Sequence, residues 1–192
     1  SNKEQITWDT DGSYLITGGL GYLGLNFAQM LADRGVRHFV LVGRSQPSDT
    51  AMTTIEQLRQ RCQVEIVQAD ISHRDDVQRA LAVCQELAPL HGIIHAAGIT
   101  QQTPLHDSTL AEMEAVFAAK IKGTWLLHEL SKHILLKHFI CFSSASSVWG
   151  ASGQAHYSAA NHFLDSLAYY RRSQNLPALT VNWGMLAGER MQ

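Results

Sequence analysis

Short apolar runs recur along the chain and alternate with longer segments whose apolar residues fall at helical spacing. Most runs are apolar throughout and do not alternate with polar residues, which is typical of strands buried on both faces of a parallel sheet. Between them, apolar residues three and four apart predict helices around Leu23–Leu31 and Val77–Leu87. The predicted strands are residues 13–17, 38–43, 64–69, 92–97, 138–143 and 178–183.

Six such strands joined by crossover helices predict an α/β fold. The expected architecture is a doubly wound Rossmann fold, with a mainly parallel six-stranded sheet and helices on both faces. The length of 192 residues suits one domain with a sizeable core. We expect residues 13–192 to form this domain and the polar residues 1–12 to be a leader or linker from a preceding segment.

Charge and composition exclude several classes of function. The net charge is −2 and the sequence pI is about 6.5, so no basic surface for nucleic acid or an anionic membrane is indicated. No apolar run approaches the roughly 20 residues that cross a bilayer, and we expect no secretory signal. The cysteines, Cys62, Cys84 and Cys141, are odd in number and far apart, which favours free thiols and a cytoplasmic protein.

The histidines do not indicate a metal site. Ten are present, but none forms an HExxH pattern or lies beside a cysteine at ligand spacing. His128, His133 and His138 recur every five residues, which does not place them on one face of a helix. We therefore expect no metal.

The stretch TGGLGYLG (17–24) follows the first predicted strand and opens the first predicted helix. Its residues Gly19, Gly21 and Gly24 fit the pattern GxGxxG, which is weak alone and much stronger between a strand and a helix. A pyrophosphate approaches backbone N–H groups at such a helix start, where a Cβ would block it or clash with the turn. The alternative is a tight turn without a ligand. We interpret the four glycines as a phosphate-binding loop.

The end of the second predicted strand distinguishes the two nicotinamide dinucleotides. An enzyme that uses NAD carries an acidic residue there, about 20 residues after the glycines, to bind the ribose 2′-hydroxyl. This sequence has LVGRS, with Arg44 and Ser45 and no acid. Because a guanidinium can bind a 2′-phosphate with two hydrogen bonds, the sequence favours NADP(H) over NAD. An ordinary surface arginine is the alternative.

Several further stretches resemble one family. TGGLGYLG, LVGRS, HAAG, FSSASS, GQAHYSAANHFLD and LPALTVNWG are similar to stretches of the ketoreductase domains of modular polyketide synthases, within the short-chain dehydrogenase/reductase superfamily. The resemblance runs from about Tyr14 to Gly184. It implies that the cofactor is contacted by Thr17, Gly18, Gly19, Leu20, Gly21, Tyr22, Leu23, Gly24, Arg44, Ser45, Asp70, Ile71, Ala96, Ala97 and Gly98.

The resemblance also implies four catalytic residues. Ser144 precedes Tyr157 by thirteen residues, which is the family's spacing, and Asn161 follows Tyr157 by four. In these ketoreductases the lysine lies in an earlier helix, which points to Lys120, whereas Lys122 is out of register and is assigned to solvent. Tyr157 would donate a proton, Ser144 would bind the substrate carbonyl, and Asn161 would hold a water or Lys120.

Elementary chemistry supports these roles. Reduction of a ketone produces an alkoxide that needs a proton, and the phenol of tyrosine, with a pKa of about 10, is a reluctant acid at neutral pH. A neighbouring ammonium such as that of Lys120 stabilises the phenolate and lowers this pKa. The expected reaction is the NADPH-dependent reduction of a β-ketoacyl thioester on an acyl carrier protein, beside the other domains of a synthase.

The sequence also bears on other functions. A serine hydrolase is set aside because FSSAS lacks the glycines of a GxSxG elbow. A catalytically idle NADP-binding module of a synthase, a fatty-acid-type ketoreductase and a methyltransferase that binds S-adenosylmethionine remain as alternatives.

Two residues bear on the stereochemistry that the resemblance implies. Trp149, eight residues before Tyr157, matches the tryptophan of A-type ketoreductases, which yield L-hydroxyl products, although it could also pack beneath its loop. Gln154 stands where the epimerising subgroup has histidine, which implies the non-epimerising subgroup. The family has a structural half-domain before this region and continues after NWG (182–184) into a lid helix, so we expect this sequence to lack the lid and Met185–Gln192 to lack order.

Overall fold

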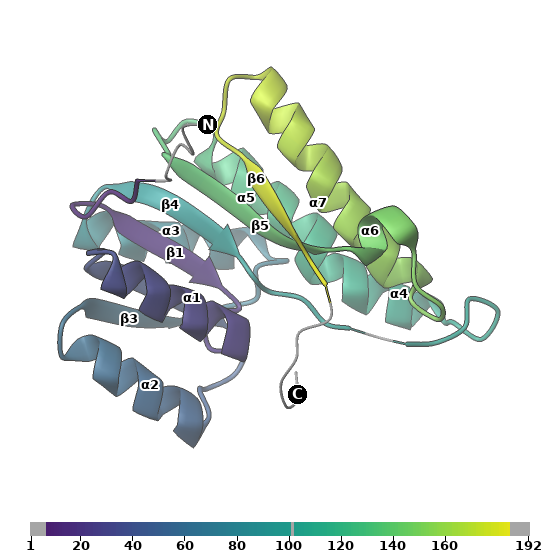
Figure 1. Ribbon diagram of the computed structural model, residues 1–192, viewed down its shortest axis with the longest axis horizontal. Coiled ribbons are helices and arrows are strands. Elements are labelled where there is room, and N and C mark those ends of the chain that lie inside the picture. Colours follow the sequence, from purple (N-terminus) through teal and green to yellow (C-terminus); the bar gives the residue numbers. More distant parts are fainter. Residues whose placement is uncertain (1–6, 101, 185–192) are drawn as a thin grey trace, which may run out of the picture.

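The computed structural model of the protein describes residues 7–100 and 102–184. Its centre is a parallel six-stranded sheet in the order β3-β2-β1-β4-β5-β6 (Figure 1). This is the strand order of a doubly wound Rossmann fold, so the predicted fold class is confirmed. The strands are β1 (Ser13–Thr17), β2 (His38–Gly43), β3 (Gln63–Gln68), β4 (Leu90–His95), β5 (His138–Ser144) and β6 (Leu179–Trp183).

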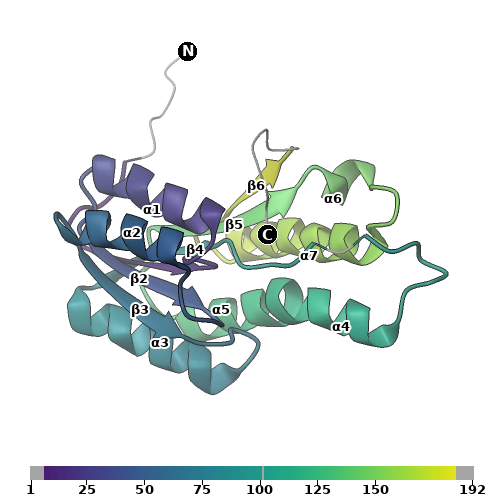
Figure 2. The same ribbon diagram turned by 90° about the horizontal axis from the view of Figure 1, so that it is seen from below.

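Helices cover both faces of the sheet (Figure 2). Helices α1 and α2 lie on one face, and α3, α5 and α7 lie on the other. Helices α4 and α6 lie beyond the end of the sheet, where they pack beside α7. The helices are α1 (Tyr22–Asp33), α2 (Asp49–Arg59), α3 (Arg74–Leu87), α4 (Leu110–Phe117), the π-helix η1 (Ala118–Gly123), α5 (Thr124–Ser131), α6 (Ser146–Trp149) and α7 (Ala155–Ser173).

Two apolar clusters, one on each face, hold these layers together. Neighbouring residues of β1 alternate between them: Leu15 packs with α3 and α5, whereas Ile16 packs with α1 and α2. Because both faces are buried, the middle of each central strand is apolar and the polar residues lie mostly near the strand ends, which is the pattern that predicts buried parallel strands. The edge strands β3 and β6 carry exposed residues, because each has a sheet neighbour on only one side.

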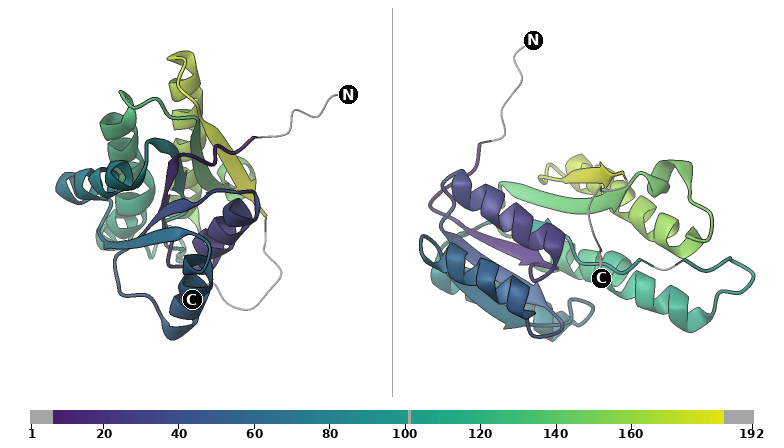
Figure 3. Two further views of the ribbon diagram at one scale, coloured as in Figure 1. Left: turned by 90° about the vertical axis from the view of Figure 1, so that its left-hand side faces the viewer. Right: turned by 60° about the horizontal axis from the view of Figure 1, so that its bottom comes forward.

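The order of strands reverses between β1 and β4. The chain leaves β1 toward α1 on one face of the sheet, and it leaves β4 toward α4 on the other (Figure 3). The two loops therefore separate at the carboxyl end of the sheet, and the crevice between them is where ligands bind in folds of this kind. The side chains of Thr17 and His95 join the two strand ends, with 2.7 Å between Thr17 Oγ1 and His95 Nδ1.

The segment before β1 packs against the opposite end of the sheet. Trp8, within the predicted leader, contacts the tilted ring of His138 at 4.6 Å between ring centroids and contacts Tyr14 and Phe27 edge-on. The expectation about Met185–Gln192 concerns residues outside the described part of the chain. The three cysteines are free and buried. Across residues 7–100 and 102–184, none of the helices has the length and apolar character needed to cross a membrane.

Candidate active site

The glycine loop between β1 and α1 needs its glycines for different reasons. Gly18 has a φ of +67°, and a Cβ there would lie 2.7 Å from the Ala97 nitrogen. A Cβ on Gly19 would lie 2.5 Å from the carbonyl oxygen of Ile16. A Cβ on Gly24 would lie 2.3 Å from the carbonyl oxygen of Gly18. Packing within the protein therefore requires these three glycines, whether or not a phosphate also contacts their backbone.

Gly21 is the exception in this loop. An added Cβ would lie 3.4 Å from the Gly18 carbonyl oxygen, which is ordinary contact, and its φ of −89° suits any residue. Gly21 is the N-cap of α1, a helix with no side-chain cap and no acidic residue in its first turn. Such a helix start binds an anion through its backbone N–H groups, and a side chain at Gly21 would reach into the anion's approach.

This difference gives a testable pair of substitutions. Gly24→Ala is expected to destabilise the fold by about 1–3 kcal/mol or more, because its Cβ meets backbone that cannot move away. Gly21→Ala is expected to leave the thermal midpoint almost unchanged but to weaken binding of the predicted nicotinamide dinucleotide by about tenfold, near 1.4 kcal/mol. Thermal unfolding and fluorescence titration measure the two effects. Equal loss of stability in both variants would contradict this division of roles.

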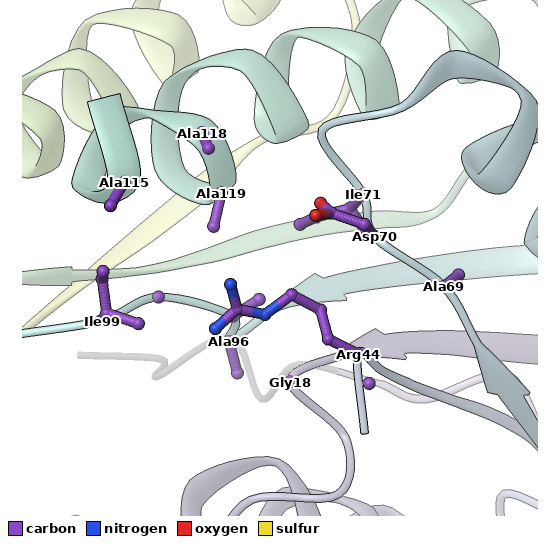
Figure 4. Close-up of a pocket in the computed structure, with 13 residues that line it drawn as sticks. Gly18, Arg44, Ala69, Asp70, Ile71, Ala96, Ile99, Ala115, Ala118 and Ala119 are labelled. Atoms are coloured by element: carbon purple, nitrogen blue, oxygen red, sulfur yellow. The ribbon is translucent and has the colours of Figure 1, made fainter. Parts of the chain in front are cut away.

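A pocket of about 180 Å³ lies beside this loop (Figure 4). That volume is smaller than the roughly 300–1,000 Å³ of a complete ligand site, so it suits one end of a dinucleotide. Several predicted cofactor residues line it: Gly18, Arg44, Asp70, Ile71, Ala96, Ala97 and Gly98. Sequence reasoning missed others: Gly43, Ala69, Ile99, Ala115, Ala118 and Ala119. The last three are small residues at helical spacing on one side of α4 and η1, a signal that the sequence did contain.

Arg44 and Asp70 give this pocket its charge. The Arg44 side chain extends into the pocket, and none of the residues in the described ranges forms an ion pair with it (Figure 4). Burial raises the pKa of Asp70, but hydrogen bonds from Ser72 and the nearby charges of His73 and Arg44 outweigh burial and leave this pKa below its usual value. The pocket therefore offers one cationic and one anionic group to a ligand.

The other predicted cofactor residues lie outside this lining. The hydroxyl of Thr17 is engaged by His95, and Leu20 packs against Gly43. Gly19, Gly21 and Gly24 belong to the loop described above, and the side chains of Tyr22, Leu23 and Ser45 are exposed, partly buried and exposed respectively.

Lys120 lies in the π-helix η1 and is only 5% exposed. Its Nζ donates a hydrogen bond to the Phe142 carbonyl oxygen at 3.0 Å and lies 5.4 Å from the centroid of the Tyr157 ring. A single π-helical turn is often found at functional sites, because it changes the direction of the side chains that it carries. Lys122, two residues further on, is exposed, in agreement with its assignment to solvent.

The surroundings of Lys120 lower its pKa. Burial lowers the pKa of Lys120 to about 8, against smaller raising effects of Cys141 and Asp165. At neutral pH the side chain is thus still an ammonium, in a place where water cannot screen it. A Cβ on Gly98 would lie 2.6 Å from Lys120 Cε, so the loop after β4 leaves just enough room for this lysine.

Helix α7 brings Tyr157 and Asn161 to the same place. Asn161 Nδ2 donates to the Tyr157 carbonyl oxygen at 2.8 Å, and the Ser143 hydroxyl donates to the Asn161 carbonyl oxygen at 3.2 Å. The second contact fixes α7 against the end of β5. Asn161 is fully buried, and its Oδ1 has no hydrogen-bond partner within the described ranges. This oxygen is an acceptor suited to a water or to the Lys120 ammonium.

Ser144 ends β5 with its hydroxyl already oriented. Its Oγ accepts hydrogen bonds from the backbone N–H of Ser146 at 3.2 Å and from the Ser146 hydroxyl at 3.0 Å. Since its lone pairs are used, the Ser144 hydroxyl proton remains to be donated to a substrate. Lys120, Ser144, Tyr157 and Asn161, which come from η1, β5 and α7, thus meet at one end of β5.

The two residues that bear on stereochemistry lie at the edge of the candidate active site. Trp149 ends α6 with 84% of its surface exposed, which does not fit a packing role beneath its loop. Gln154 is the N-cap of α7 and is partly buried. Both lie in the chain segment that leads into α7, the helix that carries Tyr157.

A Rossmann sheet whose cofactor crevice opens toward a buried lysine and a helical tyrosine is the arrangement of the short-chain dehydrogenases and reductases. The family model for the KR domain, the ketoreductase domain of polyketide synthases, matches residues 12–188. The chain belongs to this family.

Relatives and solved structures agree with this assignment. The chain is 41% identical over 185 residues to the spectinabilin polyketide synthase system protein NorB of Streptomyces orinoci, covering 94% of this chain and 8% of that protein. It matches the crystal structure of a ketoreductase domain from the bacillaene assembly line with a TM-score of 0.93 and 37% identity, covering 100% of this chain and 48% of that one. An A1-type ketoreductase matches with a TM-score of 0.92 and 36% identity, covering 98% and 40%.

The chain therefore spans less than a tenth of this synthase relative and about half of these solved ketoreductase chains. NorB is a protein of a polyketide synthase system, so the shared region is one part of a much larger machine.

Proposed function

We propose that this domain reduces a β-ketoacyl thioester, carried on an acyl carrier protein, to a β-hydroxyacyl thioester with NADPH. The observation that carries the proposal is the buried Lys120 ammonium, held 5.4 Å from the Tyr157 ring centroid and hydrogen-bonded to the Phe142 carbonyl of β5, the strand that ends with the oriented hydroxyl of Ser144. A buried charge is costly, and a site that keeps one next to a phenol is suited to stabilising a phenolate.

The residues present fit NADPH. Backbone N–H groups at the start of α1, beside the space left by Gly21, would bind the pyrophosphate. Asp70 and Ile71 would contact the adenosine end, and the unpaired Arg44 guanidinium would bind the 2′-phosphate. When bound, the reduced nicotinamide supplies the hydride, and the side chains of this domain handle the carbonyl oxygen and its proton.

The chemistry at the carbonyl oxygen divides between two hydroxyls. Ser144 donates a hydrogen bond to this oxygen and stabilises the negative charge that develops on it. As the carbonyl carbon is reduced, the O–H bond of Tyr157 breaks and its proton moves to the same oxygen, which becomes the product hydroxyl. The phenolate left on Tyr157 is stabilised by the Lys120 ammonium. The Asn161 Oδ1 would hold a water or Lys120 in place for reprotonation.

The domain would give the L-hydroxyl product without epimerisation. Support comes from the exposed Trp149 and from Gln154 at the edge of the candidate active site, and from the similarity to solved A-type ketoreductases. We further propose that residues 13–192 act as one domain beside the other domains of a synthase, in the cytoplasm.

A direct assay tests the proposed function. The full-length protein is given NADPH and either a β-ketoacyl thioester surrogate or trans-decalone, and loss of NADPH absorbance is followed. Reduction to the L-hydroxy product is expected. Binding of NADPH without turnover would indicate an idle module instead, and thermal stabilisation by S-adenosylmethionine but not NADPH would indicate a methyltransferase.

Arg44→Ala is expected to reduce the preference for NADPH over NADH by about 10- to 100-fold, because a charge-assisted contact with the 2′-phosphate contributes about 1.5–3 kcal/mol. The kcat/KM values for the two cofactors measure this preference. Arg34→Ala is the matched control, since Arg34 is an exposed arginine at the other end of α1. An unchanged preference in Arg44→Ala would show that the 2′-phosphate is bound elsewhere.

A further inference from the structure

Asp165 lies on α7 and is not one of the four proposed catalytic residues. Its Oδ2 accepts a hydrogen bond from the Ser147 hydroxyl at 2.5 Å and another from Asn182 Nδ2 at 3.1 Å. Asn182 Nδ2 also lies 2.8 Å from Ser147 Oγ. The carboxylate of Asp165 therefore joins three elements, because Ser147 belongs to α6 and Asn182 belongs to β6.

These contacts link the two groups that would meet the substrate. Ser147 lies three residues after Ser144, in the short helix α6 whose first residue, Ser146, hydrogen-bonds to the Ser144 hydroxyl. Asp165 lies eight residues after Tyr157 on the same helix, and residues at this spacing share a face. A four-residue helix has little stability of its own, so its position depends on tethers of this kind.

We propose that Asp165 is a positioning residue that ties α6 to α7 and so fixes the Ser144 hydroxyl relative to the Tyr157 hydroxyl. The inference rests on the proposed function, in which both hydroxyls meet one carbonyl oxygen. Misplacement of such a pair by about 1 Å can cost on the order of 100-fold in rate.

The charge of Asp165 has a second consequence. Lys120 is surrounded by titratable groups from three elements: His95 on β4, Cys141 on β5, and Tyr157 and Asp165 on α7. Burial lowers the pKa of Lys120, and the negative charge of Asp165 raises it. Of the two carboxyl oxygens, Oδ1 is buried and has no hydrogen-bond partner among residues 7–100 and 102–184, so part of this charge is not neutralised by a hydrogen bond. Asp165 thereby helps Lys120 to remain an ammonium.

Three variants separate the tether from the charge. Asp165→Ala removes both, Asp165→Asn removes the charge but keeps an acceptor oxygen, and Ser147→Ala removes one tether but keeps the charge. Glu86→Gln, an exposed carboxylate-to-amide change on α3, is the control. For Asp165→Ala we expect kcat to fall by about 10- to 100-fold, with the NADPH dissociation constant within about twofold of the parent, because Asp165 does not line the cofactor pocket.

The partial variants give distinct signatures. Asp165→Asn should recover most of the lost kcat, but the alkaline limb of its pH–rate profile should move to lower pH by on the order of half a unit. Ser147→Ala should lower kcat without moving that limb. Parent-like kcat and an unmoved limb in Asp165→Ala and Asp165→Asn would overturn the inference, as would a loss of kcat that is matched by a loss of NADPH binding.

Amide hydrogen exchange of Ser146–Trp149 provides a readout that does not need activity. Exchange should accelerate in Asp165→Ala and Ser147→Ala, by about tenfold or more, and stay unchanged in Glu86→Gln. If Asp165→Ala fails to fold, Ser147→Ala alone decides the outcome. An inactive parent protein would refute the proposed function, and unchanged exchange in α6 would refute the tether, so the two failures are distinguishable.

Discussion

Tyr157→Phe is expected to lower kcat for ketone reduction by about 10²- to 10⁴-fold, the range of a positioned general acid. The substitution removes one oxygen atom and keeps the ring against which Lys120 is packed. Tyr157 does not line the cofactor pocket, so the NADPH dissociation constant should change by less than about twofold. Steady-state assays with the surrogate ketone and a fluorescence titration with NADPH measure the two quantities.

Tyr169→Phe is the matched control for this prediction. Tyr169 belongs to the same helix, but its side chain is 71% exposed and remote from Lys120. This variant should retain parent activity. If Tyr157→Phe reduced the ketone at the parent rate, the proton would have to come from another group, and the proposed assignment of Tyr157 would be wrong.

The fold could be predicted from the sequence because its central strands are buried on both faces. The bounds of β1 and β2 agree with prediction to the residue. The predicted start of β4, Gly92, is two residues too late, because the strand begins with Leu90 and the polar His91. A histidine at the end of a sheet interrupts an apolar run without ending the backbone pairing, and periodicity alone cannot detect this.

The glycine loop shows that a motif does not say why each of its glycines is needed. A sequence pattern cannot tell whether a missing side chain makes room for a ligand or for the protein itself. Gly24 lies against the Gly18 carbonyl, and Gly18 lies against the loop after β4, so both are explained without a cofactor. Of the four glycines, only Gly21 has room beside its Cα for a side chain. That distinction requires the positions of atoms in the loop itself and in the loop after β4.

Other features of the site have no local sequence signal. The π-helical turn η1 that orients Lys120 is composed of AAKIKG, which is ordinary helical sequence. Asp165 contacts Ser147 and Asn182 only because three elements pack together, so no spacing along the chain predicts these contacts. Residues that bind a ligand recur in motifs, whereas residues that position them are revealed by tertiary contacts.

The cost in folding stability of burying the Lys120 ammonium leads to a second prediction, for Lys120→Met. Burial lowers the pKa of Lys120 from 10.5 to about 8, which at about 1.4 kcal/mol per unit corresponds to a cost in stability on the order of 3 kcal/mol near neutral pH. Methionine has a similar volume and no charge. The substitution also leaves the Phe142 carbonyl without its donor, at a cost of about 1–3 kcal/mol. Because this cost does not exceed the roughly 3 kcal/mol that removal of the buried charge returns, the thermal midpoint at pH 7 should be unchanged or higher.

The pH dependence of stability gives the sign of this effect. Because the folded-state pKa of Lys120 is below its unfolded value, the unfolded chain binds the proton more tightly between about pH 8 and 10.5. Stability contributed by this group therefore rises with pH across that window. The unfolding free energy of the parent should therefore rise relative to that of Lys120→Met, by up to about 3 kcal/mol over the same range, as denaturant titrations at several pH values would show.

Activity should respond in the opposite direction to stability. Without the ammonium, the Tyr157 phenolate loses its stabilising charge, so kcat should fall by about 10²- to 10³-fold, and the alkaline limb near pH 8 should be lost from the rate profile. Lys122→Met is the control, because Lys122 lies two residues away in η1 and is exposed, and it should behave as the parent in every measurement. A Lys120→Met protein that is strongly destabilised yet fully active would mean that the lysine serves the fold and not the reaction.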